Sequence, residues 1–233
     1  MNKLTVEELA GMIDQTLLEQ YISNEDLRKH CETAAQYKFK TVAINNAPVP
    51  FCKKVLEGSG VLCDAAVSFP LGQSTIETKV FETIDVIEKG AGEVDYVVNL
   101  VEVKNGNWNY VEEEMRRIVE VCNERNITTK VIFENCFLTE EEKKKLCDIA
   151  LMVKPTFIKT STGYGTGGAT VEDVKLMKAC VKDAVKIKAA GGIRDIDDAL
   201  ALIEAGANRL GTSKGVEIVE QYKLRLASEF IQS

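Results

Sequence analysis

Thr156-Phe-Ile-Lys-Thr-Ser-Thr-Gly-Tyr-Gly-Thr-Gly-Gly-Ala-Thr170 is a short apolar run that ends in a lysine, continues into a glycine-rich loop and leads to a helix start. Strand, loop and helix in this order form the repeating unit of a parallel sheet. Glycines let backbone N–H groups approach an anion closely. A buried ammonium without a partner tends to lose its proton, as nucleophilic lysines do. The stretch therefore predicts a Lys159 that is either well paired or reactive.

Units of this kind recur from one end of the chain to the other, which is typical of a parallel sheet with crossover helices. Strands are predicted at residues 12–16, 41–45, 62–67, 94–99, 130–134, 157–159, 185–188 and 209–211. Helices are predicted from residues 5 and 23, and at 50–56, 75–89, 109–125, 139–153, 170–180, 195–205 and 216–232. Thr5 and Glu8 have capping-box spacing, so an extra helix is expected before the first strand.

The alternation suits both a (β/α)8 TIM barrel and an open doubly wound sheet, and the ends of the strands favour the barrel. Nearly every predicted strand ends in polar residues: Asp14, Thr16, Asn45, Ser68, Asn99, Glu134, Lys159, Lys188, Thr212 and Ser213. In a barrel these ends converge on one mouth, whereas an open sheet spreads them along an edge. No linker or low-complexity tract divides the chain, so residues 1–233 are expected to form one α/β domain.

Composition narrows the classes of function. The chain has 233 residues and a net charge of −7, which disfavours nucleic-acid binding. It has no apolar run of membrane-spanning length and no signal-peptide pattern, so we expect a cytoplasmic protein without membrane contact. The seven scattered cysteines are expected to be reduced thiols. The single histidine, His30, lies in a helical pattern and is expected to be structural, which disfavours a metal-dependent hydrolase or aldolase.

Side-chain alternation along a strand predicts which residues share the barrel lumen. If Lys159 points inward, Phe157 shares its face and Ile158 faces the helices. Ile187 likewise faces the helices if Lys188 points inward. On the same argument further residues can face the lumen: Asp95, Val97, Asn99, Lys130, Ile132 and Glu134. Two lysines and one or more acids would then share a low-dielectric interior and shift one another's protonation.

Two lysines on neighbouring strands can produce a nucleophilic amine. The charge on Lys188 disfavours the protonated form of Lys159, so Lys159 is expected to be largely neutral and Lys188 charged. A nearby acid such as Asp95 can hold Lys188 charged and relay protons. The alternative is a buried ion-pair network of these residues and Lys130 that only fixes the barrel interior.

Three glycine-bearing turns follow strands late in the chain: Ser161-Thr162-Gly163, Gly191-Gly192-Ile-Arg194 and Gly211-Thr-Ser-Lys-Gly215. Barrels often bind phosphate at their last loops, where backbone N–H groups face the ligand. Each turn alone is equally consistent with ordinary strand-to-helix turn chemistry. Together, beside two lysines, they predict a phosphorylated carbonyl substrate.

At these residues the sequence resembles a known family. The matching motifs are Phe157-Ile-Lys-Thr-Ser-Thr-Gly163, Lys188-Ala-Ala-Gly-Gly-Ile-Arg194, Glu93-Val-Asp95, Lys130-Val-Ile and Ile13-Asp-Gln-Thr-Leu-Leu18. Together they resemble the deoxyribose-phosphate aldolases, which are class I aldolases with a (β/α)8 fold. The resemblance covers essentially the whole chain, and the first two motifs are specific to that family among barrels.

The resemblance implies reversible cleavage of 2-deoxy-D-ribose 5-phosphate to D-glyceraldehyde 3-phosphate and acetaldehyde, without metal or organic cofactor. It implies that Lys159 forms the Schiff base, that Lys188 tunes its pKa, and that Asp95 and Lys188 relay protons. Other residues are implied to contact the substrate or its phosphate: Asp14, Thr16, Lys130, Thr162, Gly163, Gly191, Gly192 and Ser213. A homo-oligomer, at least a homodimer, is also expected from the resemblance.

Two departures from the family bear on specificity. Asn45-Asn-Ala-Pro-Val-Pro50 replaces the commoner valine-asparagine-proline type of turn, and Lys214 stands where many members have a second serine. Lys214 is expected to add a cationic phosphate contact. Two alternatives stay open: another class I barrel aldolase or transaldolase with a ketose substrate, and a catalytically silent barrel that binds a sugar phosphate and acts as a regulator.

Overall fold

The computed structural model describes the backbone of residues 4–232 and the side chains of residues 4–229. Its eight strands form a closed barrel in which each strand pairs in parallel with the next and β8 pairs with β1. The strands are β1 Ile13–Leu17, β2 Thr41–Ile44, β3 Leu62–Val67, β4 Glu93–Val97, β5 Thr128–Ile132, β6 Phe157–Lys159, β7 Lys186–Ala190 and β8 Arg209–Thr212. The predicted (β/α)8 barrel is confirmed, and the open sheet is excluded.

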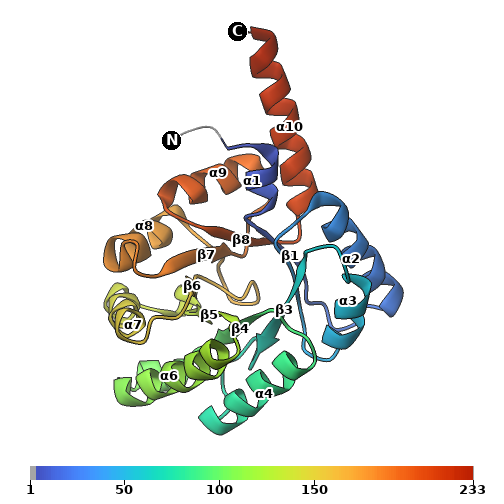
Figure 1. Cartoon of the computed structure of the whole chain (residues 1–233). Coiled ribbons are helices and arrows are strands. Elements are labelled where there is room, and N and C mark those ends of the chain that lie inside the picture. The colour runs from blue at the N-terminus through green and yellow to red at the C-terminus, as the bar shows by residue number, and fades with distance from the viewer. Residues whose placement is uncertain (1–3, 233) are drawn as a thin grey trace.

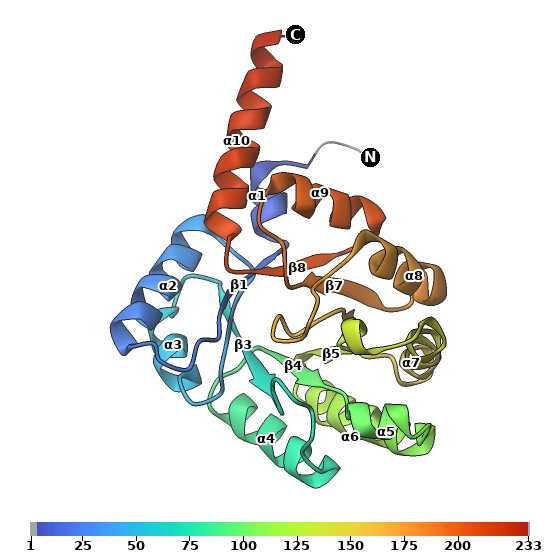
Figure 2. The same ribbon diagram turned by 180° about the vertical axis from the view of Figure 1, so that it is seen from behind.

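Helices surround the barrel as an outer ring (Figure 1). They are α1 Val6–Ala10, α2 Asn24–Tyr37, α3 Val49–Val55, α4 Ile76–Glu88, α5 Leu100–Lys104, α6 Trp108–Glu124, α7 Glu140–Val153, α8 Val171–Val181, α9 Ile196–Ala205 and α10 Gly215–Gln232. A 3-10 turn, Asn135–Phe137, follows β5. The extra helix α1 precedes β1, as predicted. The far end of α10 extends beyond the ring in both views (Figure 2).

Local sequence explains where several helices begin. The predicted capping box of Thr5 and Glu8 is present, and Thr139 with Glu142 makes another at the start of α7. In each box the threonine side chain accepts a hydrogen bond from a backbone N–H of the first turn, which would otherwise lack a partner. Two elements were not predicted, α5 and the 3-10 turn, because both are too short to show helical periodicity.

The apolar core lies between the strands and the helices. Ile158 and Ile187 belong to this core, as the alternation predicted. Phe157 faces the other way, and its ring lies 5.0 Å from the guanidinium carbon of Arg209. The lumen is therefore largely polar, while the outer face of the sheet is packed with aliphatic side chains. None of the helices in the described residues is both long and apolar enough to cross a membrane.

The fourth strand ends earlier than the sequence predicted. Asn99 was expected to end the fourth strand and face the lumen, but β4 ends at Val97. Asn99 instead caps α5, and its side-chain oxygen accepts hydrogen bonds from the N–H groups of Val101 and Glu102. An asparagine at a helix start satisfies amides that have no partner within the helix, and this local demand ends the strand early.

A buried ion pair fixes the same end of β4 from outside the barrel. Lys79 of α4 and Glu114 of α6 are fully buried, with Nζ and Oε1 2.6 Å apart. Lys79 Nζ also donates to the carbonyl oxygen of Val97 at 2.7 Å, and the other oxygen of Glu114 accepts from the N–H of Asn99 at 3.1 Å. The pair thus satisfies two backbone groups just beyond Asp95 and ties β4 to two helices.

We expect Lys79→Met to lower the free energy of unfolding by about 3–5 kcal/mol, because it leaves the Glu114 carboxylate buried without its cation. The matched control is Lys89→Met, which removes a lysine whose pair with Asp85 is exposed to solvent. That change is expected to cost about 0–1 kcal/mol. Urea denaturation measures both values, and equal losses in the two variants would contradict the importance of the buried pair.

Candidate active site

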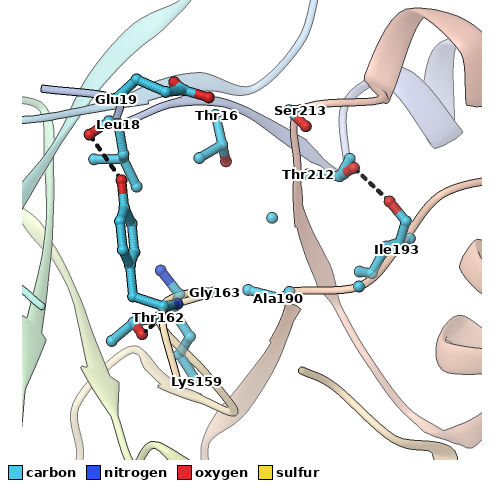
Figure 3. Close-up of a pocket in the computed structure, with 14 residues that line it drawn as sticks. Thr16, Leu18, Glu19, Lys159, Thr162, Gly163, Ala190, Ile193, Thr212 and Ser213 are labelled. Carbon is cyan, nitrogen blue, oxygen red and sulfur yellow. Dashed lines mark hydrogen bonds between the residues drawn. The ribbon is translucent and has the colours of Figure 1, made fainter. Parts of the chain in front are cut away.

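A cavity of about 370 Å³ opens at the mouth of the barrel, where the carboxyl ends of the strands meet (Figure 3). Its lining comes from the ends of β1, β6, β7 and β8 and from the loops that follow them. The lining residues are Thr16, Leu18, Glu19, Lys159, Thr162, Gly163, Tyr164, Ala190, Gly191, Gly192, Ile193, Gly211, Thr212 and Ser213. Lys159 is the one lysine among them.

Glycine backbone forms one side of the cavity. Gly163, Gly191 and Gly192 have φ angles of +89°, +83° and +79°, a region that other residues adopt only with strain. The loops that carry them touch: a Cβ on Gly168 would lie 2.2 Å from the carbonyl oxygen of Gly191. Only glycine permits this approach, and it brings the loops after β6 and β7 together beside Lys159.

The loop after β6 is held in place by two anchors that the sequence did not reveal. Glu134 accepts hydrogen bonds from the N–H of Thr162, at 3.1 Å, and from the Thr162 hydroxyl. Tyr164 donates its hydroxyl to the carbonyl oxygen of Leu18 at 2.9 Å and so joins this loop to the one after β1. Glu134 was expected at the end of the fifth strand, but β5 ends at Ile132 and Glu134 has a φ of 58°.

Beneath the cavity lies a buried network of charged side chains. Asp95 is its centre: its Oδ2 atom lies 2.6 Å from Nζ of Lys159 and 2.7 Å from Nζ of Lys188, and its Oδ1 atom lies 2.6 Å from Nζ of Lys130. The strand register brings these residues together, because Asp95 pairs with Lys130 and Lys159 pairs with Lys188. The sequence predicted that these four residues share the lumen, and the structure confirms it.

The network also contains acids and a base that were not proposed as site residues. Lys130 Nζ lies 2.8 Å from both Asp64 Oδ2 and Glu93 Oε2. Arg209 bridges Asp14 at 2.8 Å and Glu93 at 3.0 Å. Asp64 could have been found from the period-two pattern of residues 62–67, since position 64 stands alone as polar in an apolar run.

Burial and charge set the protonation of the two lysines apart. Burial lowers the pKa of Lys159 below its ordinary value, and the charge on Lys188 lowers it further, although Asp95 opposes both. Burial also acts to lower the pKa of Lys188, but Asp14, Asp64 and Asp95 together raise it above its ordinary value. Lys159 is therefore the lysine that more readily becomes a free amine, which agrees with the expected division between the two.

Three of the carboxylates come close enough together to hold a cation. Oxygen atoms of Asp14, Asp64 and Glu93 lie within 4.8 Å of one another. The ammonium of Lys130 lies against two of them, and Lys188 Nζ lies 2.6 Å from Asp14 Oδ2. Lysine ammonium groups thus already supply the positive charge that balances these acids.

All but one of the predicted site residues fall into two groups. Seven line the cavity: Thr16, Lys159, Thr162, Gly163, Gly191, Gly192 and Ser213. Four lie in the network beneath it: Asp14, Asp95, Lys130 and Lys188. Lys214 belongs to neither group, because its ammonium lies 2.9 Å from Glu217 in the first turn of α10 and it does not line the cavity. The turn at residues 45–50 is also absent from the lining.

The structure combines a closed (β/α)8 barrel, a buried lysine at its mouth and a cavity walled by glycine. This is the arrangement of a class I barrel aldolase, which uses a lysine amine as its nucleophile. The family model of the DeoC/LacD family aldolases matches residues 9–220. The chain belongs to this family. The similar proteins described next are named deoxyribose-phosphate aldolases.

Individual relatives match over almost their full length. The deoxyribose-phosphate aldolase of Lactobacillus acidophilus is 50% identical over 231 residues, which are 99% of this chain and 98% of the relative. That of Bacteroides thetaiotaomicron is 52% identical and covers 94% of this chain and 92% of the relative. The tetrameric deoxyribose phosphate aldolase of Aeropyrum pernix has a TM-score of 0.87 at 31% identity, covering 94% of this chain and 92% of that one.

Proposed function

We propose that this chain is a class I aldolase that reversibly cleaves 2-deoxy-D-ribose 5-phosphate to D-glyceraldehyde 3-phosphate and acetaldehyde. One observation carries the proposal: the single lysine that lines the cavity, Lys159, has a lowered pKa and contacts Asp95, which also contacts Lys188. A nucleophilic amine with an adjacent proton-transfer pair is what Schiff-base chemistry requires. The names of the relatives indicate the sugar.

In the proposed reaction Lys159 Nζ attacks the C1 aldehyde of the open-chain sugar, and loss of water gives an iminium ion. A water molecule held by Asp95 and Lys188 takes the C3 hydroxyl proton. The C2–C3 bond breaks, and its electron pair is drawn into the iminium. Glyceraldehyde 3-phosphate leaves, and the remaining enamine is protonated and hydrolysed to acetaldehyde and free Lys159.

The substrate phosphate is proposed to bind at the glycine wall, through Gly163, Gly191, Gly192 and Ser213. Two features support this position. The positive-φ glycines turn backbone toward the cavity without side chains in the way. Helix α10 begins at Gly215, two residues after Ser213, and the amino end of a helix attracts anions.

The decisive experiment is cleavage of 2-deoxy-D-ribose 5-phosphate followed by borohydride reduction and peptide mass spectrometry. We expect turnover and a reduced two-carbon adduct on Lys159. Assays with acetaldehyde and with dihydroxyacetone as donors separate this function from that of a ketose aldolase or transaldolase. Phosphate-ester binding with neither turnover nor adduct would instead support a silent regulatory barrel.

We expect Gly192→Ala to raise KM for 2-deoxy-D-ribose 5-phosphate by about tenfold or more, because a methyl group would enter the phosphate side of the cavity. Gly58→Ala is a matched control: its φ is +77°, its Cβ would also meet nothing within 4 Å, and it does not line the cavity. Both variants should lose about 1 kcal/mol of stability from backbone strain. Equal KM values in the two variants would contradict the proposed phosphate position.

Residues 1–233 are proposed to form a single domain of a cytoplasmic enzyme that assembles as a homodimer or a higher homo-oligomer, without nucleic-acid or membrane partners. The family relationship supports self-assembly, since the relative from Aeropyrum pernix is a tetramer. Light scattering of the purified protein tests this part of the proposal, and a monomeric mass would overturn it.

A further inference from the structure

The carboxyl group of Asp64 is a buried titratable group that the proposed reaction does not yet use. It lies on β3 and is 1% exposed. Its Oδ2 atom contacts the ammonium groups of Lys130 and Lys188, at 2.8 and 2.9 Å. Its Oδ1 atom has no hydrogen-bond partner among the described residues. A buried carboxylate oxygen without a partner favours the neutral acid over the anion, so Asp64 is suited to hold a proton.

A chain of short contacts connects Asp64 to Lys159. Lys159 Nζ lies 2.6 Å from Asp95 Oδ2, the same oxygen lies 2.7 Å from Lys188 Nζ, and Lys188 Nζ lies 2.9 Å from Asp64 Oδ2. Each step is within hydrogen-bonding distance. A proton given up by Lys159 therefore has a continuous path to Asp64 that does not leave the barrel interior.

The balance of charge in the network requires such an acceptor. Four basic and four acidic side chains are linked by ion pairs beneath the cavity: Lys130, Lys159, Lys188 and Arg209 with Asp14, Asp64, Glu93 and Asp95. When Lys159 becomes a free amine, three cations would face four carboxylates. An uncompensated buried charge is strongly unfavourable, and protonation of one carboxylate removes it.

We propose that Asp64 binds the proton that Lys159 gives up when it becomes a nucleophilic amine. This inference rests on the proposed Schiff-base function. Lys188 first gives one proton to Asp64, Lys159 Nζ gives one proton to Asp95, and Asp95 passes that proton to the amine of Lys188. Asp95 and Lys188 therefore start and finish in the same protonation states. No bond between heavy atoms changes, no other reactant is needed, and the total charge of the network stays constant.

The surroundings of Asp64 make it a better proton acceptor than Asp95. Burial, and then the negative charge of Asp95, raise the pKa of Asp64 to about 7. Asp95 is buried too, but Lys130, Lys159 and Lys188 hold its pKa well below the ordinary range. Charged groups face Asp64 from five strands: Asp14 on β1, Glu93 and Asp95 on β4, Lys130 on β5, Lys159 on β6 and Lys188 on β7. The adjacent strand β2 has no ionisable side chain.

Asp64 does not touch the substrate. It acts on Lys159 only through Asp95 and Lys188, by holding the proton, and is therefore a positioning residue. Its replacement leaves both neighbouring lysines paired, since Lys130 keeps Glu93 at 2.8 Å and Lys188 keeps Asp14 at 2.6 Å. Asp64→Asn is therefore expected to fold, and it preserves the shape of the side chain while removing its ability to titrate.

The test is the pH dependence of kcat/KM in the wild type and in Asp64→Asn. Asp64 and Lys159 share one proton in the wild type. We therefore expect two inflections in its kcat/KM profile between about pH 5 and pH 9. Asp64→Asn should show a single inflection, and Asp64→Glu should restore the second. Asp173→Asn, which removes a partly buried carboxylate outside the network, should keep both. An unchanged profile in Asp64→Asn, or one lowered by the same factor at every pH, would overturn the proposal.

Infrared difference spectroscopy gives a readout that does not depend on activity. With aspartate carboxyl groups labelled with carbon-13, the wild type at neutral pH should show an isotope-shifted band of a protonated acid that Asp64→Asn lacks. Absence of this band from the wild type would also overturn the proposal, whether or not the variant folds. Failure of the proposed function would be recognised by a different result, because borohydride would then trap no adduct on Lys159.

Discussion

Lys159→Met is expected to lower kcat for cleavage of 2-deoxy-D-ribose 5-phosphate by at least about 10⁴-fold, because the covalent route disappears together with the advantage of a prepositioned nucleophile. The barrel should stay folded. Asp95 keeps Lys130 at 2.6 Å and Lys188 at 2.7 Å, so the change leaves no carboxylate without a cation. Steady-state kinetics measures the loss, and circular dichroism checks the fold.

Ligand binding separates this result from a general disruption of the site. The glycine wall is backbone of the loops after β6 and β7 and does not use the Lys159 side chain. Lys159→Met should therefore bind glyceraldehyde 3-phosphate with an affinity near that of the wild type in calorimetry. Substantial cleavage by the variant would show that Lys159 is not the nucleophile. Loss of phosphate binding together with activity would show that the lysine does more than form the covalent bond.

Lys188→Met is expected to lower kcat/KM at neutral pH by about 10²–10⁴-fold, the range typical of proton-transfer groups. The charge on Lys188 helps to lower the pKa of Lys159, so its removal raises that pKa and leaves more Lys159 protonated. The variant should therefore regain activity as the pH rises. The acid limb of its kcat/KM profile should move upward by about 1–3 pH units.

Stability should fall in the same variant by about 3–5 kcal/mol, because Asp14 and its neighbours lose a buried cation. Lys143→Met provides the control, since it removes a partly buried lysine that lies 2.6 Å from Asp173 outside the site. The control should leave the pH profile unchanged. If the loss of activity in Lys188→Met were the same at every pH, Lys188 would not act through the protonation of Lys159.

The strands and the residues that face inward were predictable because alternation is a local property of extended backbone. Phe157, Ile158 and Lys159 lie on the faces that period two assigns to them. Asn99 and Glu134 were misplaced for an equally local reason. One caps a short helix and the other turns into a loop, and neither event changes the apolar pattern on which the strand ends were judged.

The partners of each charged residue were harder to predict. Asp64 and Arg209 lie far apart in the sequence and in different strands, and nothing in either strand reveals which cation or acid it meets. Closure of the barrel brings β1 next to β8 and places Arg209 between Asp14 and Glu93. Lys214 has a local partner instead: its ammonium lies 2.9 Å from Glu217 in the first turn of α10, and its contact with a phosphate stays a prediction.

By itself, the sequence determined the repeating strand and helix units, the inward-facing Lys159 and Lys188, and the glycine turns that stand beside them. These follow from periodicity and from the conformations that glycine allows, which are properties of neighbouring residues. The tertiary structure alone decided that four acids and four bases form one network, with Asp64 linked to Lys159 through Asp95 and Lys188. The protonation of Lys159 depends on charges brought from other strands across the lumen, and only the folded barrel sets their distances.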